Sequence, residues 1–135
     1  MADKPTIRVV AAVIEKSGRY LITQRSPRAV MPLLWEFPGG RVEPGETDAV
    51  ALSRELAEEM AITVRVGDPL TEVVKEYDRY VVDFHVYFCE LLSDTIERIK
   101  VHDYRWVTSA ELDLFPFPAA DAESVRALLE DKDAP

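Results

Sequence analysis

The chain has 135 residues, of which 47% are hydrophobic and 30% charged, as in one ordinary globular domain spanning residues 1–135. Its 25 acidic residues outnumber 16 basic ones, which gives a net charge of −9. An acidic surface of this kind repels nucleic acid and anionic membranes, so long polyanions and membranes are excluded as expected partners.

The first residues carry no targeting signal that we can identify. The segment Met1 to Pro5 lacks the build of a signal peptide, and the apolar run from Val9 to Ile14 is too short to span a membrane. Cys89 is the only cysteine, so no disulfide can form within the chain, and its apolar surroundings predict a small core residue. We therefore expect a cytoplasmic protein.

The N-terminal part predicts a β-hairpin followed by a loop. Ile7 to Glu15 and Tyr20 to Gln24 have the composition of strands, and Lys16-Ser17-Gly18-Arg19 between them is a turn signal. Residues 25–34 contain two prolines and predict a loop. Trp35 to Phe37 then predicts a short extended segment, which a proline ends.

Residues 47–60 predict an amphipathic helix. Thr47 is a suitable N-cap, and a Pro-Gly turn lies just before it. Apolar residues recur at helical spacing and would face a core, namely Ala49, Leu52, Leu56 and Met60.

The polar face of this helix carries a concentration of acid. Glu55 and Glu59 stand at i and i+4, with Glu58 at i+3 from Glu55. Like charges at these spacings repel by roughly 0.2–0.5 kcal/mol per pair, and only Arg54 is close enough to offset this. A solvated acidic face is one interpretation, and a bound cation is the other. Carboxylate oxygens suit Mg²⁺ or Mn²⁺, whereas the absence of His and Cys from the segment disfavours zinc.

The C-terminal half predicts more strands and a second helix. The strand segments are Ile62 to Val66, Leu70 to Tyr77, Val81 to Leu91 and Tyr104 to Val107. A turn at residues 67–69 is expected to separate the first two. Ser109 to Leu112 predicts a capped turn, and Asp121 to Glu130 an amphipathic helix. Strands and two helices in this order favour an α/β fold with a mixed sheet covered on both faces.

The order of the charged residues resembles the signature of the Nudix hydrolases. The signature residues occur here, at its spacing over 23 residues, as Gly40, Glu46, Arg54-Glu55-Leu56 and Glu58-Glu59. The resemblance covers nearly the whole chain and is closest to the MutT-like branch, through Trp35 to Gly40 and Phe115 to Asp121. It implies an α/β/α sandwich that hydrolyses a nucleoside triphosphate to a monophosphate and pyrophosphate under a divalent metal.

The same resemblance implies a role for each signature residue. The ligands of Mg²⁺, with Mn²⁺ as the alternative, would be Glu55, Glu58, Glu59 and the Gly40 carbonyl. Glu55, in preference to Glu58, would accept the proton of the attacking water. Arg54 would orient the carboxylates and Glu46 would hold Arg54 by a charge-assisted hydrogen bond. The alternative for Arg54 is an ordinary i, i+4 pair with Glu58.

Residues outside the signature would select the nucleotide. Asp121 stands where the MutT-like branch has an asparagine. An ionised carboxylate only accepts hydrogen bonds, so it would favour the cytosine amino group, or the N1 and amino hydrogens of guanine, over guanine O6. Its alternative role is the N-cap of the last helix. Arg25 would reach a substrate phosphate and Arg79 would lie against the base.

Several functions remain open at this point. The leading hypothesis is a nucleoside triphosphate pyrophosphohydrolase for CTP or dCTP, or for 8-oxo-dGTP, acting as a monomer or homodimer. The alternatives are cleavage of another nucleoside diphosphate compound, such as ADP-ribose or a dinucleoside polyphosphate, and a nucleotide-binding module without activity.

Two positions depart from the family pattern. Ala61 replaces a glycine that would end the helix in a left-handed conformation, so the helix end is undecided there. Lys100 stands six residues before Trp106, where related enzymes often place an additional metal-binding glutamate. Nearby acids are not in register, and we assign none of them as a ligand.

Overall fold

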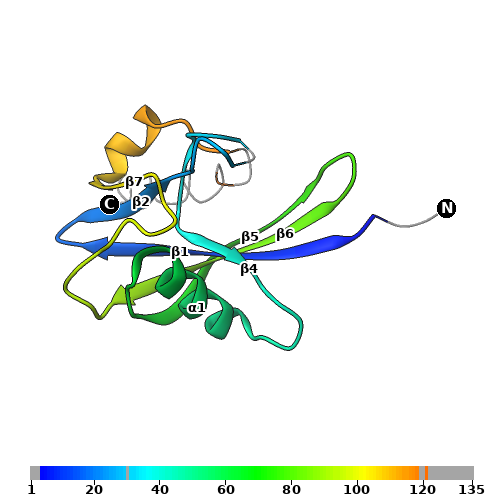
Figure 1. Cartoon of the computed structure of the whole chain (residues 1–135), viewed down its shortest axis with the longest axis horizontal. Coiled ribbons are helices and arrows are strands. Elements are labelled where there is room, and N and C mark those ends of the chain that lie inside the picture. The colour runs from blue at the N-terminus through cyan, green and yellow to red at the C-terminus, as the bar shows by residue number, and fades with distance from the viewer. Residues whose placement is uncertain (1–3, 30, 119–120, 122–135) are drawn as a thin grey trace, which may run out of the picture.

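The computed structural model describes residues 4–29, 31–118 and 121, and it shows a mixed β-sheet with a helix on one face (Figure 1). In chain order its elements are β1 (Thr6–Lys16), β2 (Arg19–Gln24), β3 (Trp35–Glu36), β4 (Gly39–Arg41), α1 (Asp48–Met60), β5 (Val64–Glu76), β6 (Val81–Leu91), β7 (Asp103–Val107) and the 3₁₀ helix η1 (Ser109–Leu114). The predicted α/β class is confirmed. The second predicted helix lies outside the described residues, apart from Asp121.

The long strand β1 organises the sheet. It pairs in parallel with β6 and antiparallel with β2 and β4, and the strand order is β3-β2-β1-β6-β5, with β4 added to β1 and β7 to β2. Ser17 and Gly18, both with positive φ, form the tight turn between β1 and β2, as the sequence predicted.

Two apolar clusters lie on opposite faces of the sheet because side chains alternate along β1. Ala11 and Val13 enter the first, with Phe84 and Val86 of β6. The second lies beneath α1 and contains the alternate residues of β1 with Leu52, Leu56 and Met60. The prediction for Cys89 is confirmed, since it is 7% exposed in this second cluster. Among the described residues, no helix combines the length and apolarity needed to cross a membrane.

Helix α1 agrees with the predicted helix except at one apolar position. Thr47 is the N-cap, and its hydroxyl accepts a hydrogen bond from the Val50 N–H at 3.2 Å. Ala49, which was predicted to face the core, is exposed. It belongs to the first turn, where Val50 is also exposed, so the packed stripe begins only at Ala51.

Ala61 ends α1 in the left-handed conformation, with φ 56° and ψ 34°, and its N–H donates to the Ala57 carbonyl at 2.9 Å. The chain therefore keeps the helix end that a glycine would normally provide. The backbone N–H groups of Ile99 and Lys100 donate to the Glu59 carbonyl at 3.1 and 3.0 Å, so the loop between β6 and β7 satisfies a terminal helix carbonyl.

Strand β4 was not predicted because Gly39 and Gly40 have low strand propensity. It pairs with β1, where Val10 lies opposite Gly40. A Cβ on Gly39 would lie 1.9 Å from the Val10 carbonyl oxygen, so only glycine allows β4 to approach β1 this closely. Gly39 is therefore a packing requirement of this strand.

The predicted turn at residues 67–69 is wrong, because β5 is a single strand. Its register with β6 shifts on both sides of Pro69, and pairing then continues to Glu76. The Gly-Asp-Pro sequence thus produces a bulge, where the hydrogen-bond pattern is interrupted. The strand does not end there, because it pairs with the long strand β6 on both sides of the bulge.

Candidate active site

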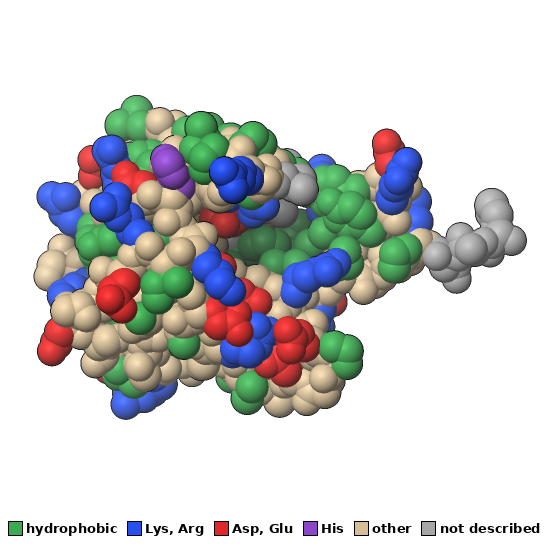
Figure 2. Space-filling model, viewed as in Figure 1, with side chains coloured by type: hydrophobic (Ala, Val, Ile, Leu, Met, Phe, Trp, Pro, Cys, Tyr) green, Lys and Arg blue, Asp and Glu red, His purple; other side chains and the backbone are tan. Residues whose placement is uncertain are grey.

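A cleft of about 740 Å³ opens beside α1. Its walls come from β1, β4 and the loop that follows β4, together with Glu55 and Glu59 of α1. Arg25, Glu36 and Asp121 also line it. Figure 2 shows the molecule hollowed near its middle, with an apolar interior and with acidic and basic side chains along the margin. The volume is in the range of pockets for small molecules.

Glu55 lies against the backbone of β4. A Cβ added to Gly40 would lie 2.3 Å from the Glu55 carboxyl carbon and 2.4 Å from one of its oxygens. The missing side chain of Gly40 is therefore the space in which this carboxylate sits. The close approach joins the α1 acids to the β4 backbone at the wall of the cleft.

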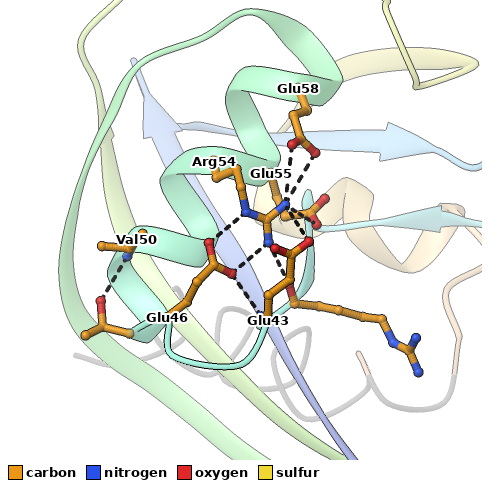
Figure 3. Close-up of polar contacts among 8 residues, drawn as sticks. Glu43, Glu46, Val50, Arg54, Glu55 and Glu58 are labelled. Atoms are coloured by element: carbon orange, nitrogen blue, oxygen red, sulfur yellow. Dashed lines mark hydrogen bonds and ion pairs between the residues drawn. The ribbon is translucent and has the colours of Figure 1, made fainter.

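Arg54 is the centre of the polar network on this side of α1 (Figure 3). Its Nε and Nη2 donate to the two carboxylate oxygens of Glu46 at 2.8 and 2.9 Å, and Nη2 also donates to the Arg41 carbonyl at 3.0 Å. Its Nη1 reaches Glu55 at 3.1 Å and Glu58 at 3.4 Å. A longer ion pair with Glu43 at 3.9 Å gives Arg54 a fifth partner, so the simple i, i+4 pair with Glu58 is only one part of the network.

Glu46 is held in its ionised form. The Arg54 guanidinium and the Glu43 backbone N–H both donate to it and lower its pKa to about 2. In return, the carboxylates raise the pKa of Arg54, with Glu46 as the main cause. The loop before α1 and the helix itself are therefore joined by a fully charged pair with two parallel hydrogen bonds.

The pKa of Glu59 is shifted in the opposite direction to that of Glu46. The Glu59 pKa is raised to about 9, first by burial and then by the nearby Glu36, Glu55 and Glu58 carboxylates, while Lys100 acts to lower it. In the absence of a metal, the protein therefore holds more carboxyl groups close together here than can all be ionised at neutral pH. A cation would offset that repulsion.

A second group of charges lies farther along the cleft. Arg25 Nη1 donates to Glu36 at 2.9 Å, and burial raises the pKa of Glu36 despite this partner. Asp121 is 3% exposed, and its Oδ1 has no hydrogen-bond partner among the described residues. Burial and the Glu36 charge raise the pKa of Asp121 well above its ordinary value, so the neutral acid is favoured. The sequence interpretation of Asp121 as an ionised acceptor did not take this burial into account, and the role of Asp121 stays a prediction.

The structure brings most of the predicted site residues together. Gly40, Glu55 and Glu59 lie at one part of the cleft, and Arg25 and Asp121 line it as well. The remaining signature residues, Arg54, Glu46 and Glu58, lie beside it in the Arg54 network. Arg79 differs, because it is exposed beyond β5 and is absent from the cleft lining.

Two cleft residues were not assigned from the sequence. Glu36 lies in the segment Trp35 to Gly40 that carried the resemblance, but only the folded chain shows it beside Arg25. Arg41 follows Gly40 and lines the cleft with an exposed side chain. Within the described residues, no carboxylate forms an ion pair with its guanidinium. A basic residue directly after the Gly-Gly pair was the signal that could have identified it.

Comparisons with known proteins agree with these features. The NUDIX domain family matches residues 9–127. The chain is 32% identical over 123 residues to a CTP pyrophosphohydrolase of Escherichia coli (strain K12), covering 91% of each chain. It is 33% identical over 131 residues to an 8-oxo-dGTP diphosphatase of Haemophilus influenzae, covering 96% of each. The crystal structure of a MutT protein from Methanosarcina mazei Go1 superposes with a TM-score of 0.85 at 26% identity, covering 99% of this chain and 100% of that one.

Proposed function

The chain belongs to the Nudix hydrolase family, and from this premise we propose that it hydrolyses a nucleoside triphosphate to a nucleoside monophosphate and pyrophosphate in the presence of Mg²⁺. The observation that carries the proposal is the position of Gly40, Glu55 and Glu59 at one part of a cleft whose lining also includes Arg25 and Asp121. Phosphates and base would then occupy the same cleft. The proposal includes a cytoplasmic protein that acts as a monomer or homodimer.

The donor atoms fit Mg²⁺. Within the part of the chain that the structure describes, no three Asp, Glu, His or Cys side chains converge closely enough to hold a metal alone. Mg²⁺ is commonly bound through one or two carboxylates together with substrate phosphates, so a complete protein cage is not needed. Glu55, Glu59 and the Gly40 carbonyl would supply oxygen ligands, with Glu58 joining from the Arg54 network. Mn²⁺ has the same ligand preference.

We assign a different part of the reaction to each group of cleft residues. A bound divalent cation would neutralise phosphate charge and lower the pKa of water in the site. The Glu55 carboxylate, which faces the cleft, would accept the proton of the attacking water. Arg54 would hold Glu55 and Glu58 in place, and Glu46 would hold Arg54. Arg25 and Arg41 would contact the phosphates, because both line the cleft.

Asp121 would read the base as a neutral acid. A neutral carboxyl group offers one donor and one acceptor side by side. It therefore matches a base edge with the same two functions, such as the amino group and N3 of cytosine, or O6 and N7–H of 8-oxoguanine. The relatives named above act on CTP and on 8-oxo-dGTP, and one protonation state accommodates both. Arg79 would need to move to contact the base, and its role stays a prediction.

A nucleotide screen tests the proposal. Purified protein with Mg²⁺ is given CTP, dCTP, GTP, 8-oxo-dGTP, ADP-ribose and a dinucleoside polyphosphate, and pyrophosphate and phosphate release are scored separately. We expect pyrophosphate from CTP, dCTP or 8-oxo-dGTP. Preferred cleavage of ADP-ribose or the dinucleoside polyphosphate would indicate the alternative hydrolase, and no release from any of them a binding module.

The same screen is run with two variants. Glu58→Gln removes one charged ligand without changing its size, so turnover should fall by orders of magnitude, about 10²-fold or more, while the protein stays folded. Glu90→Gln, an exposed glutamate paired with Arg65 away from the cleft, is the control and should keep full activity. Near-normal turnover of Glu58→Gln would contradict the metal assignment.

A further inference from the structure

The first turn of α1 is tied to the sheet by a polar cluster of Arg8, Asp48, Tyr87 and Asp83, which we call the Arg8 clamp. The Nε and Nη2 of Arg8 donate to the two oxygens of Asp48 at 2.7 Å each. Its Nη1 donates to Asp83 at 3.1 Å, and the Tyr87 hydroxyl donates to Asp48. The clamp therefore joins β1, β6 and the first residue of α1.

The charges inside the clamp are matched to one another. Arg8 and Tyr87 donate to Asp48, and these hydrogen bonds, led by that of Arg8, lower the pKa of Asp48 to about 2. Asp48 raises the pKa of Arg8 in turn. Although Arg8 lines the cleft, two carboxylates already compensate its charge. Arg8 is thus suited to hold protein segments in place, in contrast to Arg41.

The backbone of Arg8 also contacts the loop between β4 and α1, which carries Glu46. The Arg8 carbonyl accepts a hydrogen bond from the Val42 N–H at 3.0 Å, directly after β4. One residue of β1 therefore contacts both the end of β4 and the start of α1. These are the two elements whose separation sets the distance between the Gly40 carbonyl and Glu55.

The first turn of α1 has little apolar packing to hold it. Ala49 and Val50 are exposed, and the buried stripe begins at Ala51. The other end of α1 is held by backbone hydrogen bonds from the loop after β6. Because Glu55 fills the space beside Gly40 with no room for one additional carbon, a small shift of the helix start would alter this contact.

We propose that Arg8 and Asp48 are positioning residues for the metal site, which they align by fixing the first turn of α1 against β1 and the end of β4. The inference rests on the metal site of the proposed function. Neither residue would contact the metal or the nucleotide. Loss of the clamp would therefore weaken metal binding while leaving the ligands themselves intact.

Binding of Mn²⁺, measured from the electron paramagnetic resonance signal of the free ion, tests this without any turnover. In Arg8→Gln and in Asp48→Asn we expect the half-saturating Mn²⁺ concentration to rise about three- to tenfold. This is at or below the roughly 10–100-fold loss of metal affinity that is usual when a residue that orients a metal ligand is replaced. The double variant should resemble either single variant, because both break the same contact. Arg8→Lys, which keeps the charge, should recover part of the affinity.

Arg65→Gln is the matched control. It removes an exposed arginine–glutamate pair of 3.1 Å between β5 and β6, and it should leave Mn²⁺ binding unchanged. If Arg8→Gln does not fold, Tyr87→Phe removes a single hydroxyl from the clamp and should still raise the half-saturating concentration. Folded clamp variants that bind Mn²⁺ as tightly as the wild type would overturn the inference. Absence of Mn²⁺ binding by the wild type, both alone and with a non-hydrolysable nucleoside triphosphate present, would instead overturn the metal site of the proposed function.

Discussion

Gly39 and Gly40 are adjacent in β4, yet the structure gives them different tasks. The space beside Gly39 is filled by backbone atoms of β1, with the Val10 carbonyl oxygen 1.9 Å from where a Cβ would lie. The space beside Gly40 is filled by the Glu55 side chain. One glycine is thus required for folding, and the other leaves room for a carboxylate of the proposed site.

This difference predicts contrasting effects of the same substitution. Gly40→Ala should fold, because a side chain can move away, but it should displace Glu55 and lower turnover about 100-fold. Gly39→Ala should destabilise the protein by about 3 kcal/mol or more, because the new methyl group would clash with the backbone of Val10, which strand pairing holds in place. Urea unfolding and steady-state kinetics measure the two effects. A Gly40→Ala protein with normal turnover would contradict the close contact with Glu55.

Helix α1 carries the acids of the proposed site and is held differently along its length. The Arg8 clamp holds its start, the apolar stripe holds its middle, and backbone hydrogen bonds from the loop before β7 hold its end. Ala61 closes it in a conformation that costs a residue with a Cβ about 1–2 kcal/mol. The contacts of the loop before β7 offset this cost.

Ala61→Gly should therefore stabilise the protein. We expect the free energy of unfolding to rise by about 0.5–1 kcal/mol, because glycine adopts positive φ without strain but also gains freedom in the unfolded chain. Ala57→Gly is the matched control within the helix, where glycine should cost about 1 kcal/mol. Denaturant unfolding measures both. A loss of stability in Ala61→Gly would show that the left-handed residue carries no strain.

The molecule as a whole carries a net charge of −9 and nevertheless places acids together around its cleft. Glu46 and Asp48 are stabilised as anions by arginines, which lower their pKa values to about 2. Glu59 and Asp121 are destabilised as anions, mainly by burial. Glu46 and Asp48 are thus paired in the supporting contacts, whereas burial opposes the charges of Glu59 and Asp121 where a cation and a nucleotide are proposed to bind.

The pH dependence of stability follows from these opposite shifts. Glu59 has a pKa of about 9 in the folded protein and 4.5 ordinarily, so the folded state holds this proton more tightly. Its contribution to stability is full below pH 4.5 and is lost as the pH rises toward 9. We expect the metal-free protein to be less stable at pH 8.5 than at pH 5.5, measured by urea unfolding with a chelator present.

Glu59→Gln isolates this contribution. The variant should lose less stability than the wild type between the two pH values, because the group that must ionise is absent. Glu46 and Asp48 act in the opposite direction, since their contribution is present above their ordinary pKa values and is lost only toward pH 2. The same pH dependence in Glu59→Gln and wild type would contradict the burial of an unpaired acid here.

Much of the fold could be predicted from local patterns. Turn residues and the spacing of apolar residues predict the β1–β2 hairpin, helix α1 and β6, and both signals come from residues close together in the sequence. The exceptions depend on distant partners. β4 exists because Gly39 lets it approach and pair with β1, and β5 continues through Gly-Asp-Pro because it pairs with β6 on both sides of this segment. Ala49 has helical spacing but belongs to a turn that the core does not reach.

The sequence by itself determined the family, the acidic face of α1 and the oxygen chemistry of the proposed site, because the spacing of residues along a helix is a local property. Only the tertiary structure decided which acids reach the cleft and in what state. The pKa of Asp121 is raised because folding buries it beside Glu36. Arg54 becomes the centre of five partners because the loop before α1 brings Glu43 and Glu46 back to it. Burial and charge neighbourhood are set by residues far apart in the chain, and they are fixed when the chain folds.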